Sequence, residues 1–86
     1  MKFLYGYEEP YYIDISFIIF KKCFKDDGIF VPSGDGNRVE LIGWDPYPNI
    51  LKHILVIDNN NNRYIYDSKR EIDIKFGSIS SQLSNK

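Results

Sequence analysis

Residues 42–58, IGWDPYPNILKHILVID, decide how this chain folds, because a turn-rich bend leads there into its most hydrophobic strand-like run. From residue 51 to residue 58, one face would carry leucine, histidine, leucine and isoleucine, and the other lysine, isoleucine, valine and aspartate. That period of two is a strand's, and apolar residues on both faces place the strand in the middle of a sheet. Pro46 and Pro48 fix φ around Tyr47 and disfavour helix before them, so the chain turns just before the strand.

Shorter strand-like runs lie on both sides of this segment. We expect them, in chain order, at residues 2–6, 11–16, 29–31, 39–42, 63–67 and 72–76. Residues 33–38, SGDGNR, have the composition of a loop, and the asparagines at 59–62 suit a hairpin connection because Asn tolerates left-handed φ. Short strands separated by turn signals predict a mainly β fold, a small antiparallel β-sandwich or partly open barrel of about five to seven strands.

One short helix is predicted over residues 17–25. Phe17, Phe20 and Phe24 recur there at helical spacing, while the lysines between them face elsewhere. Ser16 is the expected N-cap, and Gly28 is expected to mark the helix end. We expect this helix to plug an open end of the β structure.

Length and composition allow one small domain. The chain has 86 residues, and its 43% hydrophobic and 16% aromatic content indicates a folded protein whose rings supply much of the core. Residues 1–76 are the predicted domain, and the serine-rich residues 77–86 are a predicted flexible tail. A domain this small is marginally stable alone, which favours association with itself or with a partner.

Charge and cysteine usage narrow the function classes. A net charge of −1, with acids and bases interspersed, disfavours non-specific nucleic-acid binding. Cys23 is the only cysteine, so no intramolecular disulfide is available and a reducing compartment is indicated. The N-terminus does not resemble a signal peptide, and the longest apolar run, at 17–20, is too short to cross a membrane. We therefore expect a soluble, cytoplasmic protein.

Catalytic, metal and cofactor signals are weak. His53 is the only histidine; with Asp14 and either Ser16 or Cys23 it would make a nucleophile-base arrangement, but its place on a central strand favours a hydrogen-bonded structural role.

The glycine-rich residues 33–38 do not predict a ligand site either. Asp35 there, and the aspartates at 26–27, lack the register and closing glutamate of a calcium loop. Gly34 and Gly36 lack the Lys-Ser/Thr step of a phosphate-binding loop, and no helix is expected to begin after them. No metal and no cofactor are predicted.

Aromatic residues near predicted turns are the better binding candidates. If the rings cluster at the domain edge beside a cation or the histidine, they would form a stacking and hydrogen-bonding surface, although core packing is the commoner use of such rings. The candidate ligand- or partner-binding residues are Trp44, Tyr47, Tyr7, Tyr12, Arg38, Lys52 and His53, with Tyr11 beside them.

Several short motifs carry a resemblance. They are an aromatic-glycine start, an Ile-Asp-aliphatic-Ser strand, a Lys-Asp step, an aliphatic-proline strand end and a glycine-aromatic-Asp-Pro bend before a lysine, at residues 5–6, 13–16, 25–26, 31–32, 43–46 and 52. Together they resemble the C-terminal domain of a mitochondrial-associated J-domain protein family, and also small stand-alone proteins of large DNA viruses of amoebae. The likeness spans residues 4–76 and implies a β-rich adaptor domain without established catalytic residues. The J-domain His-Pro-Asp motif is missing, so cochaperone activity is not implied, and 72–76 lack the family's final proline.

Three functional hypotheses follow from these observations. The leading one is a non-enzymatic binding module, of viral origin if the resemblance holds, that engages a protein partner or a second copy through an aromatic edge or an open strand. The second is a receptor for a nucleotide or sugar that uses the rings with Arg38, Lys52 or His53. The third, least favoured, is a small hydrolase that uses His53.

Overall fold

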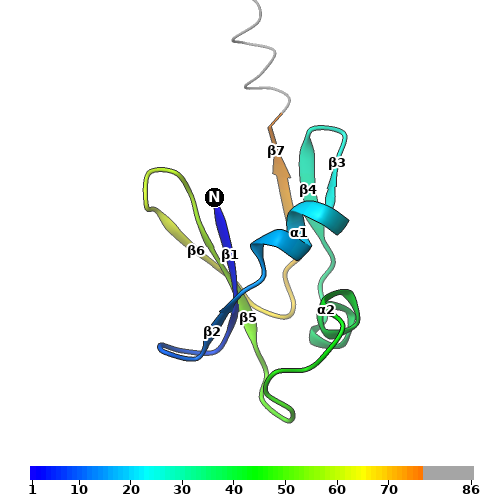
Figure 1. The fold of residues 1–86 in the computed structure, drawn as a ribbon, viewed down its shortest axis with the longest axis vertical. Coiled ribbons are helices and arrows are strands. Elements are labelled where there is room, and N and C mark those ends of the chain that lie inside the picture. Colours follow the sequence, from blue (N-terminus) through cyan, green and yellow to red (C-terminus); the bar gives the residue numbers. More distant parts are fainter. Residues whose placement is uncertain (77–86) are drawn as a thin grey trace, which may run out of the picture.

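The computed structural model describes residues 1–76, which form two antiparallel sheets and two short helices (Figure 1). One sheet has the strand order β2-β1-β5-β6 and the other β3-β4-β7. The mainly β, sandwich-like fold predicted from the sequence is confirmed. In chain order the elements are β1 (Lys2–Gly6), β2 (Tyr12–Asp14), α1 (Ser16–Lys22), β3 (Phe24–Lys25), β4 (Gly28–Val31), α2 (Asp35–Ile42), β5 (His53–Ile57), β6 (Arg63–Tyr66) and β7 (Ile72–Lys75).

β5 lies in the interior of its sheet, as its two apolar faces predicted. It pairs with β1 on one side and β6 on the other, so that Leu55 stands opposite Leu4 and Ile65. The three residues at the centre of β5, positions 54–56, are each at most 3% exposed. The asparagines that follow connect β5 to β6 as a hairpin, with Asn61 at a φ of +65°.

The core lies between the two sheets. Phe3 and Tyr5 of β1 and Ile54 of β5 enter it from one sheet, and Ile29 of β4 and Ile72 of β7 from the other, and all are at most 1% exposed. Ile19 of α1 is also fully buried, and α1 contacts β1 of the first sheet together with β3 and β4 of the second. The amphipathic helix therefore joins the two layers, which is how so short a chain encloses a core.

A second helix, α2, corrects the predicted loop at 33–38 and the predicted strand at 39–42. Its buried residues, Arg38 and Ile42, are four apart and so share one helical face. Gly43 ends the helix in the left-handed conformation at φ +103°, where its N–H donates to Val39 O at 2.8 Å. The glycines at 34 and 36 made this helix difficult to predict from the sequence, because glycine has a low helix propensity.

The ends of the first helix also differ from the prediction. Ser16 lies inside the first turn and Ile15 is the N-cap, because the Ser16 hydroxyl accepts from Phe3 N–H at 2.8 Å. The helix ends before the predicted residue 25, and the next reversal uses positive φ at Asp26 and Asp27. Gly28 is part of β4, where a Cβ would lie only 2.7 Å from Ile74 O. Glycine is needed there for close strand approach, not as a helix stop.

Arg38 is a fully buried cation that joins α2 to the chain on either side of the core. Its Nε donates to Pro32 O at 3.2 Å, and Nη1 donates to the carbonyl oxygens of Tyr66 and Asp67 at 3.2 and 2.9 Å. Nη2 donates to the carbonyl oxygen of Arg70. The buried guanidinium thus has all its bonds to main-chain carbonyl groups, and it ties α2 to Pro32 and to the β6–β7 connection.

Replacing Arg38 with Met should lower the free energy of unfolding by about 3 to 5 kcal/mol, because four carbonyl groups lose their shared donor and α2 loses its links to Pro32 and to the β6–β7 connection. Urea denaturation measures the loss. Arg63→Met is the control, since its side chain is 60% exposed and its contact with Glu9 is a surface ion pair at 3.7 Å, worth less than about 1 kcal/mol. Similar losses in both variants would contradict the role given to Arg38.

Candidate functional site

Three tyrosines from two loops meet beyond one end of the first sheet. Tyr7 and Tyr11 stack with ring centroids 5.3 Å apart and an interplanar angle of 5°. Tyr47 stands edge-on to both, with centroids at 5.2 and 6.2 Å. We call these three residues the tyrosine cluster. Tyr11 is 44% exposed and the other two are half-buried, so the cluster is a rigid but partly open aromatic surface.

The phenol groups of the cluster are free within the described part of the chain. No hydrogen bond among residues 1–76 uses the hydroxyl of Tyr7, Tyr11 or Tyr47. Desolvation, with Tyr11 and Glu8 nearby, raises the pKa of Tyr7 above its usual 10.0, so the phenol keeps its proton at neutral pH. The surface can therefore both donate and accept hydrogen bonds at the edges of apolar rings.

Buried Lys52 holds the loop that carries Tyr47. Its side chain is 0% exposed, and Nζ donates to Tyr47 O at 3.1 Å and Ile50 O at 2.6 Å. Asp45 forms an ion pair with the same ammonium at 3.0 Å and also accepts from Tyr47 N–H at 3.0 Å. One buried charge thus fixes a loop that has no regular secondary structure between Gly43 and β5.

The same ammonium connects this loop to α2 and to β1. Lys52 Nζ lies 3.0 Å from Asp35 Oδ2, and the Tyr5 hydroxyl donates to Asp35 Oδ1 at 2.5 Å. Burial alone would lower the pKa of Lys52, but the bonds to Asp35 and Asp45 raise it above the ordinary 10.5. Burial and the Asp35 carboxylate also raise the pKa of the Tyr5 phenol, so the network is fully charged at Lys52 and fully protonated at Tyr5.

Lys52→Met should lower the free energy of unfolding by about 2 to 3 kcal/mol, because two carboxylates and two carbonyl oxygens lose a shared donor. This loss of stability is smaller than for a fully buried charge left without a partner, since the Asp35 and Asp45 side chains are 20% and 32% exposed and can be hydrated. Hydrogen exchange should accelerate at residues 44–51. Lys22→Met is the control, because that exposed lysine bonds only Leu41 O; unchanged exchange in Lys52→Met would contradict the role.

His53 is paired with Tyr12 and not with a catalytic group. The Tyr12 hydroxyl and His53 Nε2 are 2.5 Å apart, on β2 and β5, and the imidazole is half-buried. Burial, and then the charge of Arg38, lower the pKa of His53 below its ordinary 6.5, so the ring is neutral at neutral pH. A neutral ring that carries its hydrogen on Nδ1 accepts a hydrogen bond from the phenol at Nε2, which fits the structural role predicted for this histidine.

The His53 pKa should be below 6.5 in an NMR titration of the ring protons, and Tyr12→Phe should raise it, because the phenol bond favours the neutral ring. A lowered pKa in the folded state means that the unfolded chain binds the proton more tightly. Stability should therefore fall as the pH drops below about 6.5. A measured pKa at or above 6.5 in the wild type would refute this assignment.

The other groups of the hydrolase hypothesis are engaged elsewhere. Asp14 accepts from Ser16 N–H at 2.9 Å, and the Ser16 hydroxyl bonds Phe3. Cys23 is buried, and burial raises the pKa of its thiol. None of the hydrogen bonds of residues 1–76 joins His53 to any of these three side chains.

A helix does begin after Gly34, contrary to the expectation. Its N-terminus is nevertheless a poor site for a phosphate group, because other parts of the chain already interact with it. Gly34 N–H donates to Ser68 O at 2.6 Å, and Asp35 in the first turn brings a negative charge that repels anions. In the described residues no group of three or more histidine, cysteine, aspartate or glutamate side chains could hold a metal ion.

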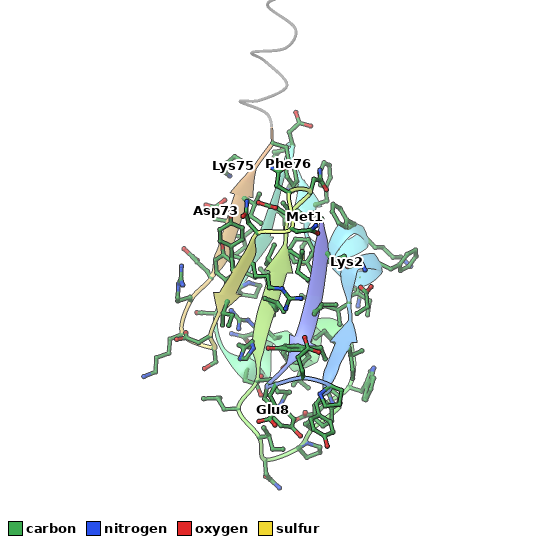
Figure 2. The ribbon with its side chains drawn as sticks, turned by 90° about the vertical axis from the view of Figure 1, so that its left-hand side faces the viewer. Met1, Lys2, Glu8, Asp73, Lys75 and Phe76 are labelled. Atoms are coloured by element: carbon green, nitrogen blue, oxygen red, sulfur yellow. The ribbon has the colours of Figure 1, made fainter. Side chains whose placement is uncertain are left out.

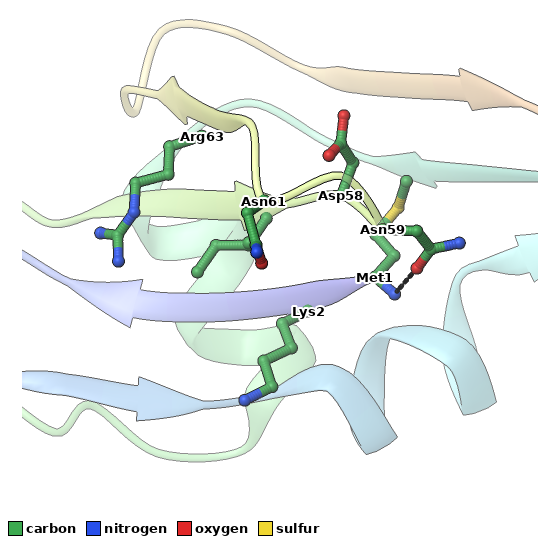
Figure 3. A pocket seen from close by; sticks show the side chains of 7 residues that line it. Met1, Lys2, Asp58, Asn59, Asn61 and Arg63 are labelled. Carbon is green, nitrogen blue, oxygen red and sulfur yellow. Dashed lines mark hydrogen bonds between the residues drawn. The ribbon is translucent and has the colours of Figure 1, made fainter.

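A polar hollow of about 370 Å³ lies between the start of β1 and the asparagine hairpin (Figure 3). The N-terminal ammonium there donates to Asn59 Oδ1 at 2.9 Å, while Lys2 and Arg63 extend along the sheet face. Asp58 Oδ1 accepts from the N–H groups of Asn62 and Asn60 at 2.9 and 2.8 Å, and these bonds lower the pKa of its carboxyl group. The hollow is thus bordered by a self-bonded turn, which is the solvated role predicted for the asparagines.

The structure separates the predicted binding residues into four groups. Tyr7 and Tyr47 belong to the cluster, and Tyr12 and His53 form a pair on the sheet. Trp44 is 55% exposed in the Tyr47 loop and has no aromatic ring partner among residues 1–76. Arg38 and Lys52 are buried with their donors used by the protein itself, so the structure does not bring either cation to the exposed rings.

Sequence reasoning missed two features of the structure. The aspartates that neutralise Lys52 were not proposed, although Asp45-Pro46 lies in the quoted bend. Away from the tyrosine cluster, the exposed ring of Phe24 lies 6.4 Å from that of Phe20 and 6.1 Å from the half-buried ring of Phe76. Helical spacing indicated Phe20 and Phe24, but only the tertiary fold brings Phe76 to them.

Comparison of the chain with protein-family models, with curated proteins and with solved structures finds no match. The resemblance to the J-domain protein family's C-terminal domain therefore stays a prediction. Within residues 1–76, neither helix has the length and apolar character needed to cross a membrane.

Proposed function

We propose that this chain is a non-enzymatic binding module that engages a protein partner through the tyrosine cluster. The observation that carries the proposal is that Tyr7, Tyr11 and Tyr47 are packed together, partly exposed, with phenol groups that bond no residue of 1–76. Tyrosine and tryptophan are over-represented among residues that dominate protein interfaces, since they offer large contact area with few rotamers to freeze.

The surroundings of the cluster support a macromolecular partner. The loop that carries Tyr47 also exposes large apolar side chains, with Trp44 at 55%, Ile50 at 39% and Leu51 at 69%. Lys52 holds this loop in place before any partner arrives, so little ordering entropy remains to be lost on binding. A fixed loop with several exposed apolar residues is the kind of surface that marks an interaction site.

The small-ligand hypothesis receives less support from the same geometry. It placed Arg38, Lys52 or His53 beside the rings, but both cations are buried and hydrogen-bonded within the protein, and His53 is bonded to Tyr12. Tyr7 and Tyr11 also stack on each other, so the ring faces that a sugar or base would use are partly taken. A phosphate-bearing ligand would thus lack a cation at this surface.

The proposal is tested with Tyr11→Ala, which removes the most exposed ring of the cluster. Wild-type chain immobilised as bait should retain a partner from an extract of the cells that express it, and the variant should retain at least tenfold less, since loss of an interface tyrosine costs about 2 kcal/mol or more. Tyr64→Ala is the matched control, because Tyr64 of β6 is 45% exposed against 44% for Tyr11. Equal retention by Tyr11→Ala and wild type would count against the cluster as the site.

A further inference from the structure

The two sheets present four edge strands, and β7 is the longest that no side chain caps. β2 has three residues and β3 two, so both are too short to pair with much of another chain. β6 has four, but the Arg70 guanidinium donates to Ile65 O at 3.2 Å and covers that edge. β7 also has four residues, and no hydrogen bond of residues 1–76 occupies its outer side.

The backbone of β7 shows which residues face outward. Phe76 N–H donates to Asp27 O at 2.6 Å, toward β4, and the ladder pairs Ile74 with Ile29 and Ile72 with Val31. Because the direction of the N–H and C=O groups alternates along an antiparallel strand, those of Asp73 and Lys75 point away from β4. In Figure 2, β7 lies at the margin of the molecule with Asp73 and Lys75 along it.

The side chains along the β7 edge are complementary to those of the same edge in a second copy of the chain. In an antiparallel pair centred on Ile74, Asp73 faces Lys75 of the second strand, and Lys75 faces Asp73. On the opposite face Ile74 meets Ile74 of the second strand, whereas Ile72 is already fully buried within its own chain. Within one chain the Lys75 ammonium already lies 3.3 Å from Asp73 Oδ1, on side chains that are 70% and 50% exposed.

We propose that β7 pairs antiparallel with β7 of a second copy of this chain, with Asp73 opposite Lys75. The contact is isologous, joins the two three-stranded sheets into one, and satisfies the outward N–H and C=O groups of both residues. It uses a different element from the tyrosine cluster, so it goes beyond the proposed function.

An apolar hollow beside β7 fits the same contact. It measures about 200 Å³, lies between the sheets, and is lined mainly by Met1, Val56, Tyr64, Tyr66 and Ile74. Ile74 is at the centre of the proposed pairing, so a second copy would cover the hollow's β7 side. The short strand makes the dimer weak, and its population depends on concentration.

Sedimentation velocity of the full chain over a range of concentrations tests the proposal. The wild type should shift from 10.1 kDa toward twice that mass as concentration rises. Lys75→Asp places like charges opposite each other at both ends of the pair and should weaken dimerisation about tenfold or more, as should Asp73→Lys. The double variant D73K/K75D restores opposite signs and should recover the dimer.

Lys25→Asp is the matched control, since Lys25 is exposed on β3 of the same sheet but outside the proposed contact, and it should dimerise like the wild type. Tyr11→Ala should also leave the dimer unchanged. A wild type that stays monomeric at every concentration, a dimer that Lys75→Asp does not weaken, or a double variant that does not recover would each overturn the proposal. Circular dichroism of each variant separates these outcomes from loss of fold.

Discussion

The structure depends on keeping two buried cations satisfied. Lys52 and Arg38 are at most 1% exposed, and a bare charge at such depth would cost several kcal/mol. Each cation therefore draws acceptors from several parts of the chain. Lys52 gathers Asp35, Asp45 and two carbonyl oxygens, and Arg38 gathers the carbonyls of the β6–β7 connection and of Pro32. These hydrogen bonds fix the loop before β5 and the β6–β7 connection, neither of which is held by a helix or a sheet.

This constraint also explains why so small a chain can keep irregular loops at its ends. The apolar core comes mainly from short strands, with Ile19 of α1 and Ile42 of α2, and it does not reach the loop between Gly43 and β5. Hydrogen bonds from an ammonium with a raised pKa take the place of apolar packing there. Because the loop itself supplies only two carbonyl oxygens and the Asp45 carboxylate to this ammonium, the side chain of Trp44 remains exposed and that of Tyr47 half-exposed, open to other contacts.

Local patterns predicted most of the strands and failed where a residue's role is tertiary; they missed β3, whose residues were assigned to the first helix. Alternation located β5, because a strand that is apolar on both faces has one stable environment, and the asparagines after it located the hairpin. The same reasoning read VELI at 39–42 as a strand, since the four-residue spacing of Arg38 and Ile42 is a helical signal only if Arg38 is buried. An arginine is seldom fully buried, so nothing local indicated it. Gly28 was wrongly predicted to end the first helix for a similar reason. Glycine is needed there because of the close approach of Ile74, which is 46 positions later in the chain.

The burial of Arg38 and Lys52 limits the kinds of ligand that the surface around the tyrosine cluster could bind. A lysine and an arginine near aromatic residues suggested recognition of an anionic or sugar ligand, yet folding uses both charges internally. In the proposed function, the tyrosine cluster would bind through its phenol groups and ring edges, which suit the mixed polar and apolar surface of a protein. Charge is instead available at the rim of β7, where Asp73 and Lys75 alternate with isoleucines. If β7 pairs with a second copy, opposite charges would set the register of that pair, so the two proposed surfaces would differ in kind: one would select by shape and aromatic contact, the other by sign and register.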